Sequence, residues 1–463
     1  MEFTIDRSKY DESNEDTSAY KAPPGITKEI VLQISKQKNE PEWMLQKRLA
    51  ALELFAKTPL PKWGPNLDKL DLNKITFFVR PGAKEAKTWD EVPEAIRKTA
   101  ERIGIPEAER LHLSGAGYQY DSDVVYHNLK KEWDEKGVIF ENMDIAVKKY
   151  PELVKKYFMT SCVPINDHKF VMLHAAVWSG GTFIYVPQGV KVTVPLQAYF
   201  RMNAQSGGQF EHTLIIADKD SEVHYIEGCS APRFEANALH AGCVELHVLE
   251  GAKIKYSSVE NWSKNTYNLN TKRAVVSKNG TVAWVNGNMG SGCTMLYPCS
   301  ILAGENAHAD YLGIAFAGPG QNQDTGSKVI HASPNTTSNI RAKSISKGGG
   351  ISSYRGYLRA TNAAKNARTS VVCDALLIDD KSTSNTYPFM KIDNNQVEIS
   401  HEASVGKIGE EEIFYLMSRG LSEEEALKMI VAGFIEPIVR QLPLEYAVEL
   451  NKLIELEMEN SVG

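Results

Sequence analysis

The sequence predicts a mainly β protein whose core is a right-handed parallel β-helix, flanked by an N-terminal and a C-terminal helical region. A six-residue pattern recurs eight times at intervals of 27 to 31 residues. Polar and apolar residues alternate within each copy, as in a strand with one buried face. Helical periodicity appears before and after the repeats. The eight copies are Gly189–Val194, Asp220–Tyr225, Gly251–Tyr256, Asn279–Trp284, Asn306–Tyr311, Asn335–Ile340, Asn366–Val371 and Asn394–Ile399.

The phase of the alternation predicts which side chains point inward. The fourth and sixth residues of the copies are mostly apolar, whereas the fifth residues are mostly polar. A chain that turns once per copy stacks equivalent strands and buries the apolar face as one column. A period in this range also fits a β-propeller, but propeller blades need about four strands in about 40 to 50 residues. The propeller is therefore the second choice.

Three regions are expected in order along the chain. Residues 1–160 form an N-terminal helical region, residues 161–407 the β-helix core and residues 408–463 a C-terminal helical domain. The apolar spacing in the first region is helical over three segments. These segments are Thr27–Ala56, Trp89–Ile103 and Val124–Phe158.

The C-terminal region carries helix signals of its own. Ser422–Glu425 predicts a capping box, Gly420 and Gly433 fall near predicted helix ends, and Pro443 is expected to open the last helix. We expect the apolar stripe of that helix to pack against the end of the solenoid. The alternative is that the surface of residues 421–434 docks another subunit. The stripe consists of Leu444, Val448, Leu450, Leu453, Leu456 and Met458.

Composition and motifs bear on location and partners. The net charge is −6 with both signs interspersed, which gives no indication of a nucleic-acid or membrane partner. The acidic N-terminus resembles neither a signal nor a transit peptide, and no apolar run reaches the roughly 18 residues of a membrane span. We therefore expect a cytoplasmic protein. The glycine-rich stretches at Gly318 and Lys347 lack the P-loop pattern, so we expect no ATPase site.

The six cysteines show no metal-site spacing. They lack a CxxC pair and a nearby cluster of histidines, which argues against a disulfide framework and a structural zinc site. Most of them are expected to be buried, apolar thiols. They are Cys162, Cys229, Cys243, Cys293, Cys299 and Cys373.

Two of the inward positions indicate chemistry. Seven residues after the start of the last two copies stand Cys373 and His401. Adjacent strands lie about 4.8 Å apart, so these side chains are expected to be vertical neighbours, and both are ligands for soft or borderline metals. Glu402 is a candidate third ligand or proton acceptor, but it points the other way unless the strand ends or bulges. The alternative is a hydrogen-bonded histidine beside a core thiol.

Five stretches carry a resemblance to a known family: Thr369–Asp379, Glu398–Phe434, Phe200–Asp218, Tyr225–Pro232 and Leu442–Gly463. They closely resemble the SufB/SufD family of the SUF iron–sulfur cluster assembly machinery, and in particular its scaffold branch, SufB. The resemblance extends over essentially the whole chain. It implies a scaffold that receives sulfur and iron, builds a transient [4Fe–4S] or [2Fe–2S] cluster and passes it to acceptor apoproteins. A role for reduced flavin is left open.

The resemblance also implies partners and residue roles. The partners are a SufC-type ABC ATPase near the C-terminal helices, a SufD-type paralogue or a second copy of the chain, and a sulfur donor protein. Cys373 is implied to be the principal cluster ligand, with His401 and Glu402 close by. Cys229 is implied to accept sulfur as a persulfide, which as a thiolate reaction calls for a lowered pKa. The residues implied to line a sulfur path are Arg201, Asn203, Glu260, Trp262 and Lys272.

The chain departs from the family pattern at three places. Some members have glutamate at the position of Ser400, and some have glutamine at the position of Glu260, so ligation and sulfur transfer stay open in detail. Some members also carry a CxxC-type motif near the N-terminus that is absent here. No cluster chemistry is therefore expected before Cys162.

Two other function classes remain. The first is a noncatalytic, SufD-like partner subunit, which the pairing of Cys373 with His401 and Glu402 disfavours. The second is a carbohydrate-active β-helix enzyme. Such enzymes place carboxylates along an outer groove, whereas the outward column here has only Asp310 and Glu398 as acids.

Overall fold

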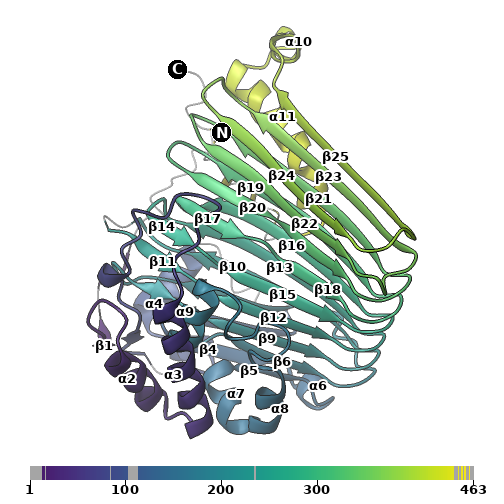
Figure 1. Cartoon of the computed structure of the whole chain (residues 1–463). Coiled ribbons are helices and arrows are strands. Elements are labelled where there is room, and N and C mark those ends of the chain that lie inside the picture. Colours follow the sequence, from purple (N-terminus) through teal and green to yellow (C-terminus); the bar gives the residue numbers. More distant parts are fainter. Residues whose placement is uncertain are drawn as a thin grey trace.

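A parallel β-solenoid forms the centre of the protein, as predicted (Figure 1). The structure is a computed structural model that describes residues 13–15, 17–83, 85–102, 113–233, 236–442, 447, 450, 451, 453, 454 and 458. Each turn contributes one strand to a ten-stranded sheet. In spatial order this sheet comprises β25 (Val397–Lys407), β23 (Ala367–Leu377), β21 (Thr337–Ser346), β19 (His308–Ala317), β16 (Thr281–Gly290), β13 (Lys253–Trp262), β10 (Glu222–Ser230), β7 (Leu196–Arg201), β3 (Gly115–Tyr120) and β4 (Asp123–Leu129).

The other side of the solenoid is a thirteen-stranded sheet. Its early turns each supply two short strands, whereas the later turns supply one long strand. The early strands are β5 (Ile139–Asn142), β6 (Thr182–Val186), β8 (Gly208–Gln209), β9 (His212–Ala217), β11 (Ala238–His240), β12 (Cys243–Val248), β14 (Thr266–Asn268), β15 (Thr271–Val276), β17 (Cys293–Leu296) and β18 (Cys299–Leu302). The late strands are β20 (Asn322–His331), β22 (Ile351–Ala360) and β24 (Thr383–Ile392).

The turn residues explain why the repeats begin where they do. The first residue of seven of the eight copies has a positive φ, between 56° and 73°. Glycine, asparagine and aspartate tolerate this left-handed conformation better than other residues. They stand at every copy's first position, so the sequence marks the corners of the solenoid directly.

The predicted inward face is confirmed in the middle of the solenoid. In the second to seventh copies, the residues at the fourth and sixth positions are all buried, and no residue at the fifth position is buried. The first copy differs, because Val194 is 37% exposed. Lys191 aligns with Glu222 but Leu196 aligns with Tyr225. The first turn therefore has two extra residues beside Pro195, and Leu196 takes the inward place that was expected for Val194.

The N-terminal region mixes helices with strands. The predicted helix over Val124–Phe158 is wrong in its first part, because residues 123–129 are the strand β4, antiparallel to β3. Short apolar runs such as this one fit a strand and a helix equally well. The helices of the region are α2 (Lys28–Lys38), α3 (Glu42–Lys57), α4 (Glu94–Arg102), α6 (Lys131–Asp134), α7 (Met143–Lys149), α8 (Pro151–Tyr157) and α9 (Lys169–Val177). The described part of this region also contains two 3-10 helices, η1 (Leu72–Lys74) and η2 (Trp89–Glu91), and the strand pair β1 (Ser18–Lys21) and β2 (Val79–Pro81).

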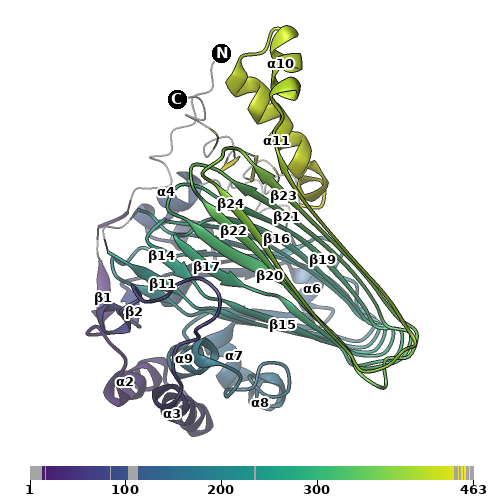
Figure 2. The same cartoon turned by 45° about the horizontal axis from the view of Figure 1, so that its top comes forward.

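The N-terminal helices cover one side of the solenoid. Figure 2 shows α2, α3, α7, α8 and α9 gathered beside the thirteen-stranded sheet. Their apolar side chains share one core cluster with the outward residues of β9 and β12. At the start of the solenoid, β3, β4 and β5 extend the two sheets beyond the first turn. The division at residue 160 stays a prediction, since β3 already pairs with β7.

The C-terminal helices are α10 (Glu410–Ser418) and α11 (Glu423–Val439). The capping box at Ser422 and Glu425 is confirmed. Gly420 follows α10 with a φ of 97°, as predicted, but Gly433 lies inside α11 and does not end it. Pro443 lies outside the described residues.

The predicted apolar stripe packs elsewhere than expected. Its described members Leu450, Leu453 and Met458 join a cluster with Val259 and Val285, on the outer side of β13 and β16. They therefore cover the flank of the ten-stranded sheet, not the end of the solenoid. Leu444, Val448 and Leu456 lie outside the described residues. Every helix in the described part of the chain is too short or too polar to cross a membrane.

Candidate functional site

Cys373 and His401 meet at the last turn of the solenoid. The Cys373 Sγ lies 3.8 Å from the His401 Nε2. Cys373 is on β23 and His401 on β25, which are paired parallel strands. The two side chains that the sequence placed together are therefore neighbours.

The register between these strands differs from the prediction. Cys373 aligns with Ala403, and His401 aligns with Val371. The last copy thus begins two residues later than its Asn394 indicated. Because residues two apart share one face of a strand, the slip of two residues keeps His401 inward, and the pair survives.

Glu402 lies apart from this pair. β25 runs without interruption through Glu402, which aligns with Val372. Residues 397, 399 and 401 are partly buried, whereas residues 398, 400 and 402 are exposed. The strand neither ends nor bulges at Glu402, so this carboxylate is on the opposite face from His401.

The surroundings of Cys373 are apolar and close to an uncovered edge. The thiol is buried, and burial raises its pKa to about 12. A bound metal ion deprotonates a coordinating thiol outright. Beside it, β24 and β25 are the last strands of their sheets, and they expose Phe389 (57%) and Val405 (55%). A ligand at Cys373 thus lies one strand from an edge that can receive another protein.

A second site lies inside the solenoid, where charged side chains fill the space between the sheets. We call it the central polar cluster, and all its members are buried. Lys272 Nζ lies 2.7 Å from Glu260 Oε1 and 3.7 Å from Glu227 Oε1. Buried charges persist in proteins when they are paired in this way. The cluster comprises Glu211, Glu227, Cys229, His240, Ser258, Glu260, Asn268 and Lys272.

Hydrogen bonds connect this cluster across the two sheets. Asn268 Nδ2 donates to Glu260 Oε2 (2.6 Å), and the Asn268 Oδ1 lies 2.9 Å from His240 Nδ1. The other nitrogen of His240 is 2.5 Å from Glu211 Oε1. Burial lowers the pKa of His240, but Glu211, Glu260 and Asn268 together raise it above its usual value. Along this series of contacts, anionic groups therefore alternate with cationic or polar groups.

Cys229 is part of this cluster, but its thiol is not activated as expected. Its Sγ lies 3.9 Å from Glu227 Oε1. Burial, followed by the charges of Glu227 and Glu260, raises the pKa of Cys229 well above its usual value, although Lys272 opposes the shift. The expectation of a lowered pKa is therefore wrong, because burial and the surrounding carboxylates outweigh the one lysine.

The remaining residues of the implied path lie in three different places. Trp262 packs on His240 with ring centroids 4.2 Å apart, so it lines the cluster. Arg201 is buried and donates to Ser230 Oγ (3.0 Å), one residue beyond Cys229 and on the opposite face of the sheet. Asn203 lies past the end of β7, where its Oδ1 accepts from the backbone N–H of Asn14 (2.9 Å).

Several members of the cluster were not predicted from the sequence. Glu227 and Ser258 lie seven residues after the start of their copies, at inward positions, but no role was predicted for them. A carboxylate at a buried position is itself a sign of a functional or ion-paired site. His240 and Asn268 come from strands of the other sheet, and Glu211 from the link between β8 and β9. Nothing in their local pattern shows that they face Glu260.

One inward column links the cluster to Cys373. Glu227, Ser258, Asn286, Gly313, Ala342 and Cys373 align from strand to strand. Five strand steps separate β10 from β23 along this column, which at about 4.8 Å each amount to about 24 Å. Gly313 lets the Tyr311 ring lie against its backbone, in space that any larger side chain would fill. The column is narrow and packed.

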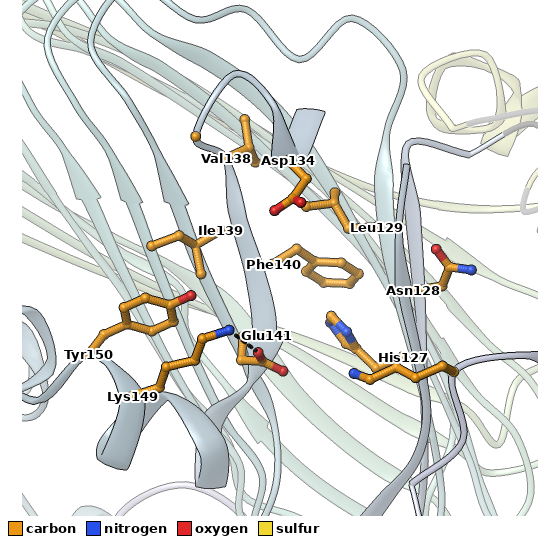
Figure 3. Close-up of a pocket in the computed structure, with 12 residues that line it drawn as sticks. His127, Asn128, Leu129, Asp134, Val138, Ile139, Phe140, Glu141, Lys149 and Tyr150 are labelled. Carbon is orange, nitrogen blue, oxygen red and sulfur yellow. Dashed lines mark hydrogen bonds and ion pairs between the residues drawn. The ribbon is translucent and has the colours of Figure 1, made fainter. Parts of the chain in front are cut away.

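A separate pocket of about 530 Å³ lies near the start of the solenoid (Figure 3). His127 packs on Phe140 there, with ring centroids 4.3 Å apart, and burial lowers the pKa of His127 to about 3. Lys149 and Glu141 form an ion pair at its rim. None of the six cysteines, which are all free and buried, lines this pocket. It therefore offers no thiol for sulfur or cluster chemistry.

Comparisons with known proteins point in one direction. A family model described as "SUF system FeS cluster assembly, SufBD core domain" matches residues 200–434, and one described as "SufBD protein N-terminal region" matches residues 112–198. Among similar proteins are iron–sulfur cluster assembly SufBD family proteins of Staphylococcus aureus (strain MRSA252) and Staphylococcus epidermidis. Each is 52% identical over 455 residues, which cover 98% of both chains.

Proposed function

The chain belongs to the SufBD family of the SUF system for iron–sulfur cluster assembly, and within this family we propose that it is the SufB-type scaffold. In this role it receives sulfur and iron, builds a nascent cluster and passes the cluster to acceptor apoproteins. The single observation that carries the proposal is the contact of Cys373 with His401 beside an open strand edge.

The donor set at Cys373 suits a cluster that must leave again. One thiolate and one imidazole form a weaker ligand field than the four thiolates that commonly hold a cluster. Glu402 can join this set only if β25 is distorted, since it faces away in the continuous strand. A partner chain that pairs with β25 would bring further ligands to the same edge.

Sulfur delivery is proposed to begin at Cys229. Its thiolate attacks the terminal sulfur of a donor protein's persulfide, a new S–S bond forms at Cys229, and the donor's thiolate leaves. Glu227, 3.9 Å from the thiol, is placed to take the proton, and burial raises the pKa of Glu227 in spite of Lys272, which makes this carboxylate a better base. Arg201, Asn203, Glu260, Trp262 and Lys272 are proposed to support transfer toward Cys373.

The proposed partners fit two exposed surfaces. The edge formed by β24 and β25 suits a SufD-type paralogue or a second copy of the chain, because an uncovered strand edge pairs readily with another strand. The C-terminal helices expose Phe414 (72%), Tyr415 and Met429, which suit a SufC-type ATPase. That partner would supply ATP hydrolysis, and the chain itself is proposed to be a cytoplasmic, noncatalytic component. A role for reduced flavin as the electron source is left open.

Anaerobic reconstitution with iron and sulfide tests the scaffold role. Absorption and Mössbauer spectra of the wild type should report a cluster and its type, and Cys373→Ala and His401→Ala should each lose or alter it. Cys293→Ala is a matched control, because Cys293 is also a buried thiol but lies on β17, away from the pair. A cluster that is equally affected by all three substitutions, or by none, would contradict the assignment.

The persulfide step is tested separately. Cys229→Ser should leave the circular dichroism spectrum unchanged while reducing assembly from a persulfide donor, with assembly from free sulfide retained. Unchanged assembly from both sources would identify Cys229 as a core thiol. If the wild type binds no cluster alone or with a SufD-type paralogue, the SufD-like partner role is the better description.

A further inference from the structure

A group of ligand-type side chains lies on the outer side of the thirteen-stranded sheet, away from the central polar cluster. His212 on β9 and Cys243 on β12 are directly aligned in the sheet, and His174 reaches them from α9. One ligand atom from each of the three lies within 4.8 Å of the other two. All three residues are at most 1% exposed. The group joins the N-terminal helical layer to two turns of the solenoid.

Each histidine has an oxygen atom close to its other ring nitrogen. His174 Nδ1 lies 2.9 Å from the carbonyl oxygen of Ala241, and His212 Nε2 lies 3.2 Å from Glu245 Oε2. Glu245 itself accepts the backbone N–H groups of Met159 (2.6 Å) and Val163 (2.9 Å). Metal-binding histidines in proteins nearly always direct their second nitrogen to a carbonyl or carboxylate, and both histidines have such a group beside that nitrogen.

The two histidines turn one ring nitrogen each toward the other. Three close contacts form a row: Ala241 O with His174, His174 Nε2 with His212 Nδ1 (3.0 Å), and His212 with Glu245. His174 donates its Nδ1 proton to the carbonyl oxygen of Ala241, so its Nε2 carries a lone pair. When His212 holds its proton on Nε2, its Nδ1 lone pair faces His174 Nε2. A cation between the two nitrogens accepts both lone pairs.

We propose that His174 Nε2, His212 Nδ1 and Cys243 Sγ bind a borderline divalent transition metal such as Zn²⁺ or Fe²⁺. Two imidazoles and one thiolate match the preferences of these ions. Tetrahedral coordination at ordinary bond lengths separates two nitrogen ligands by about 3.4 Å and nitrogen from sulfur by about 3.6 Å. The nitrogens, now 3.0 Å apart, have to move by only a few tenths of an ångström. A fourth position is left for a small exogenous ligand.

The walls of the site suit a retained ion. The Phe158 ring lies 4.1 Å from the His212 ring and the Trp178 ring lies 6.1 Å from it, centroid to centroid. These rings keep water away from the histidines. Because no ligand is exposed, the ion has to enter before α9 packs on the sheet. It then links α9 to β9 and β12, a structural role that is separate from cluster assembly at Cys373.

A neighbouring triad provides a matched control. Cys162, Glu245 and His247 also bring one ligand atom each within 4.8 Å of one another, and all are buried. Here each Glu245 oxygen already accepts one backbone N–H group, so a metal ion would have to share these oxygens with backbone donors. The triad with Cys243 is therefore the favoured site, and Cys162→Ser tests the alternative with the same chemical change.

The experiment uses the full chain carrying Cys373→Ala and His401→Ala, so that the proposed cluster site contributes no ligand. The protein is produced in minimal medium with Co²⁺, which replaces Zn²⁺ or Fe²⁺ and reports its ligands by colour. We expect one cobalt per chain after desalting and a thiolate-to-cobalt charge-transfer band. Cys243→Ser should abolish that band, whereas Cys162→Ser should keep it.

Three results would overturn the proposal. The first is folded, full-length protein without bound cobalt, which would mean that an extra proton completes the row instead. The second is a band that is lost in Cys162→Ser and kept in Cys243→Ser. The third is a cobalt X-ray absorption spectrum of the background protein that lacks one sulfur and two imidazole ligands. This last measurement needs no substitution in the site and decides the question even if Cys243→Ser fails to fold.

Discussion

The ion network around Lys272 permits a sharp test of how the solenoid tolerates charge in its interior. Lys272→Met keeps the length and apolar character of the side chain but removes the ammonium group. Glu260 then loses its partner at 2.7 Å, Glu227 its partner at 3.7 Å and the Ser258 hydroxyl its donor at 3.0 Å. Both carboxylates stay buried, at 0% and 1% exposure.

The expected loss follows from this burial. Removing one partner of a buried ion pair leaves an uncompensated charge and costs about 3 to 5 kcal/mol of unfolding free energy. Adding Glu260→Gln removes one of the two uncompensated charges. The amide oxygen of the glutamine can still accept the hydrogen bond from Asn268. The double variant should therefore recover at least about 1 kcal/mol relative to Lys272→Met, a coupling typical of contacting residues.

Urea denaturation followed by circular dichroism, with reversibility checked by refolding, measures these differences. Lys278→Met is the control, because Lys278 pairs with Glu305 only at 3.9 Å and both side chains are about half exposed. Its loss should be below about 0.5 kcal/mol. A loss below about 1 kcal/mol for Lys272→Met, or no recovery in the double variant, would refute the view that Lys272 holds the buried carboxylates in place.

Three further predictions concern pH and the exposed surfaces. Burial lowers the pKa of His331 to about 4, so the free energy of unfolding is highest above about pH 6.5. It falls by at most about 3 kcal/mol as the pH decreases toward about 4. The urea midpoints at pH 7 and pH 5 should therefore differ less in His331→Asn than in the wild type. Phe414→Asp should weaken binding of a SufC-type ATPase in calorimetry without changing thermal stability, since Phe414 is 72% exposed. Val405→Lys on β25 should reduce self-association or pairing with a SufD-type paralogue, measured by light scattering, and undiminished association would place the interface elsewhere.

Much of the fold could be predicted because particular residue types mark the corners of the solenoid. Glycine, asparagine or aspartate at the turns, followed by alternating residues, predicted the strands that stack in register from β10 to β23. The first and last turns could not be predicted to the residue. Two extra residues lie beside Pro195, and the last copy begins two residues after Asn394. Counting from the turn residue does not detect such a shift in strand register.

The contact between Cys373 and His401 could be predicted, but the central polar cluster could not. Cys373 and His401 lie in consecutive copies, so periodicity alone brought them together, and a slip of two residues preserved their common face. Lys272 and Glu260, by contrast, come from opposite sheets. Their contact depends on how far apart the two sheets lie, which no local pattern encodes.

The same limit applies to His174, His212 and Cys243. They belong to three separate elements, so the absence of a metal-type spacing in the sequence did not bear on whether the fold assembles such a site. Cysteine spacing is informative only when the ligands come from one or two adjacent segments.

The two ends of the solenoid are unlike, and this bears on how chains can join. At the start, the outermost strands β4 and β5 run antiparallel to their neighbours, whereas at the other end β24 and β25 continue the parallel stack. A rod with two like ends could grow head to tail into a filament, as heterologous contacts do when they fail to close. Here the last turn of one chain would meet an antiparallel strand of the next, not a continuation of its own stack. Contact between the last turns of two chains uses the same edge of both, so such a pair is closed.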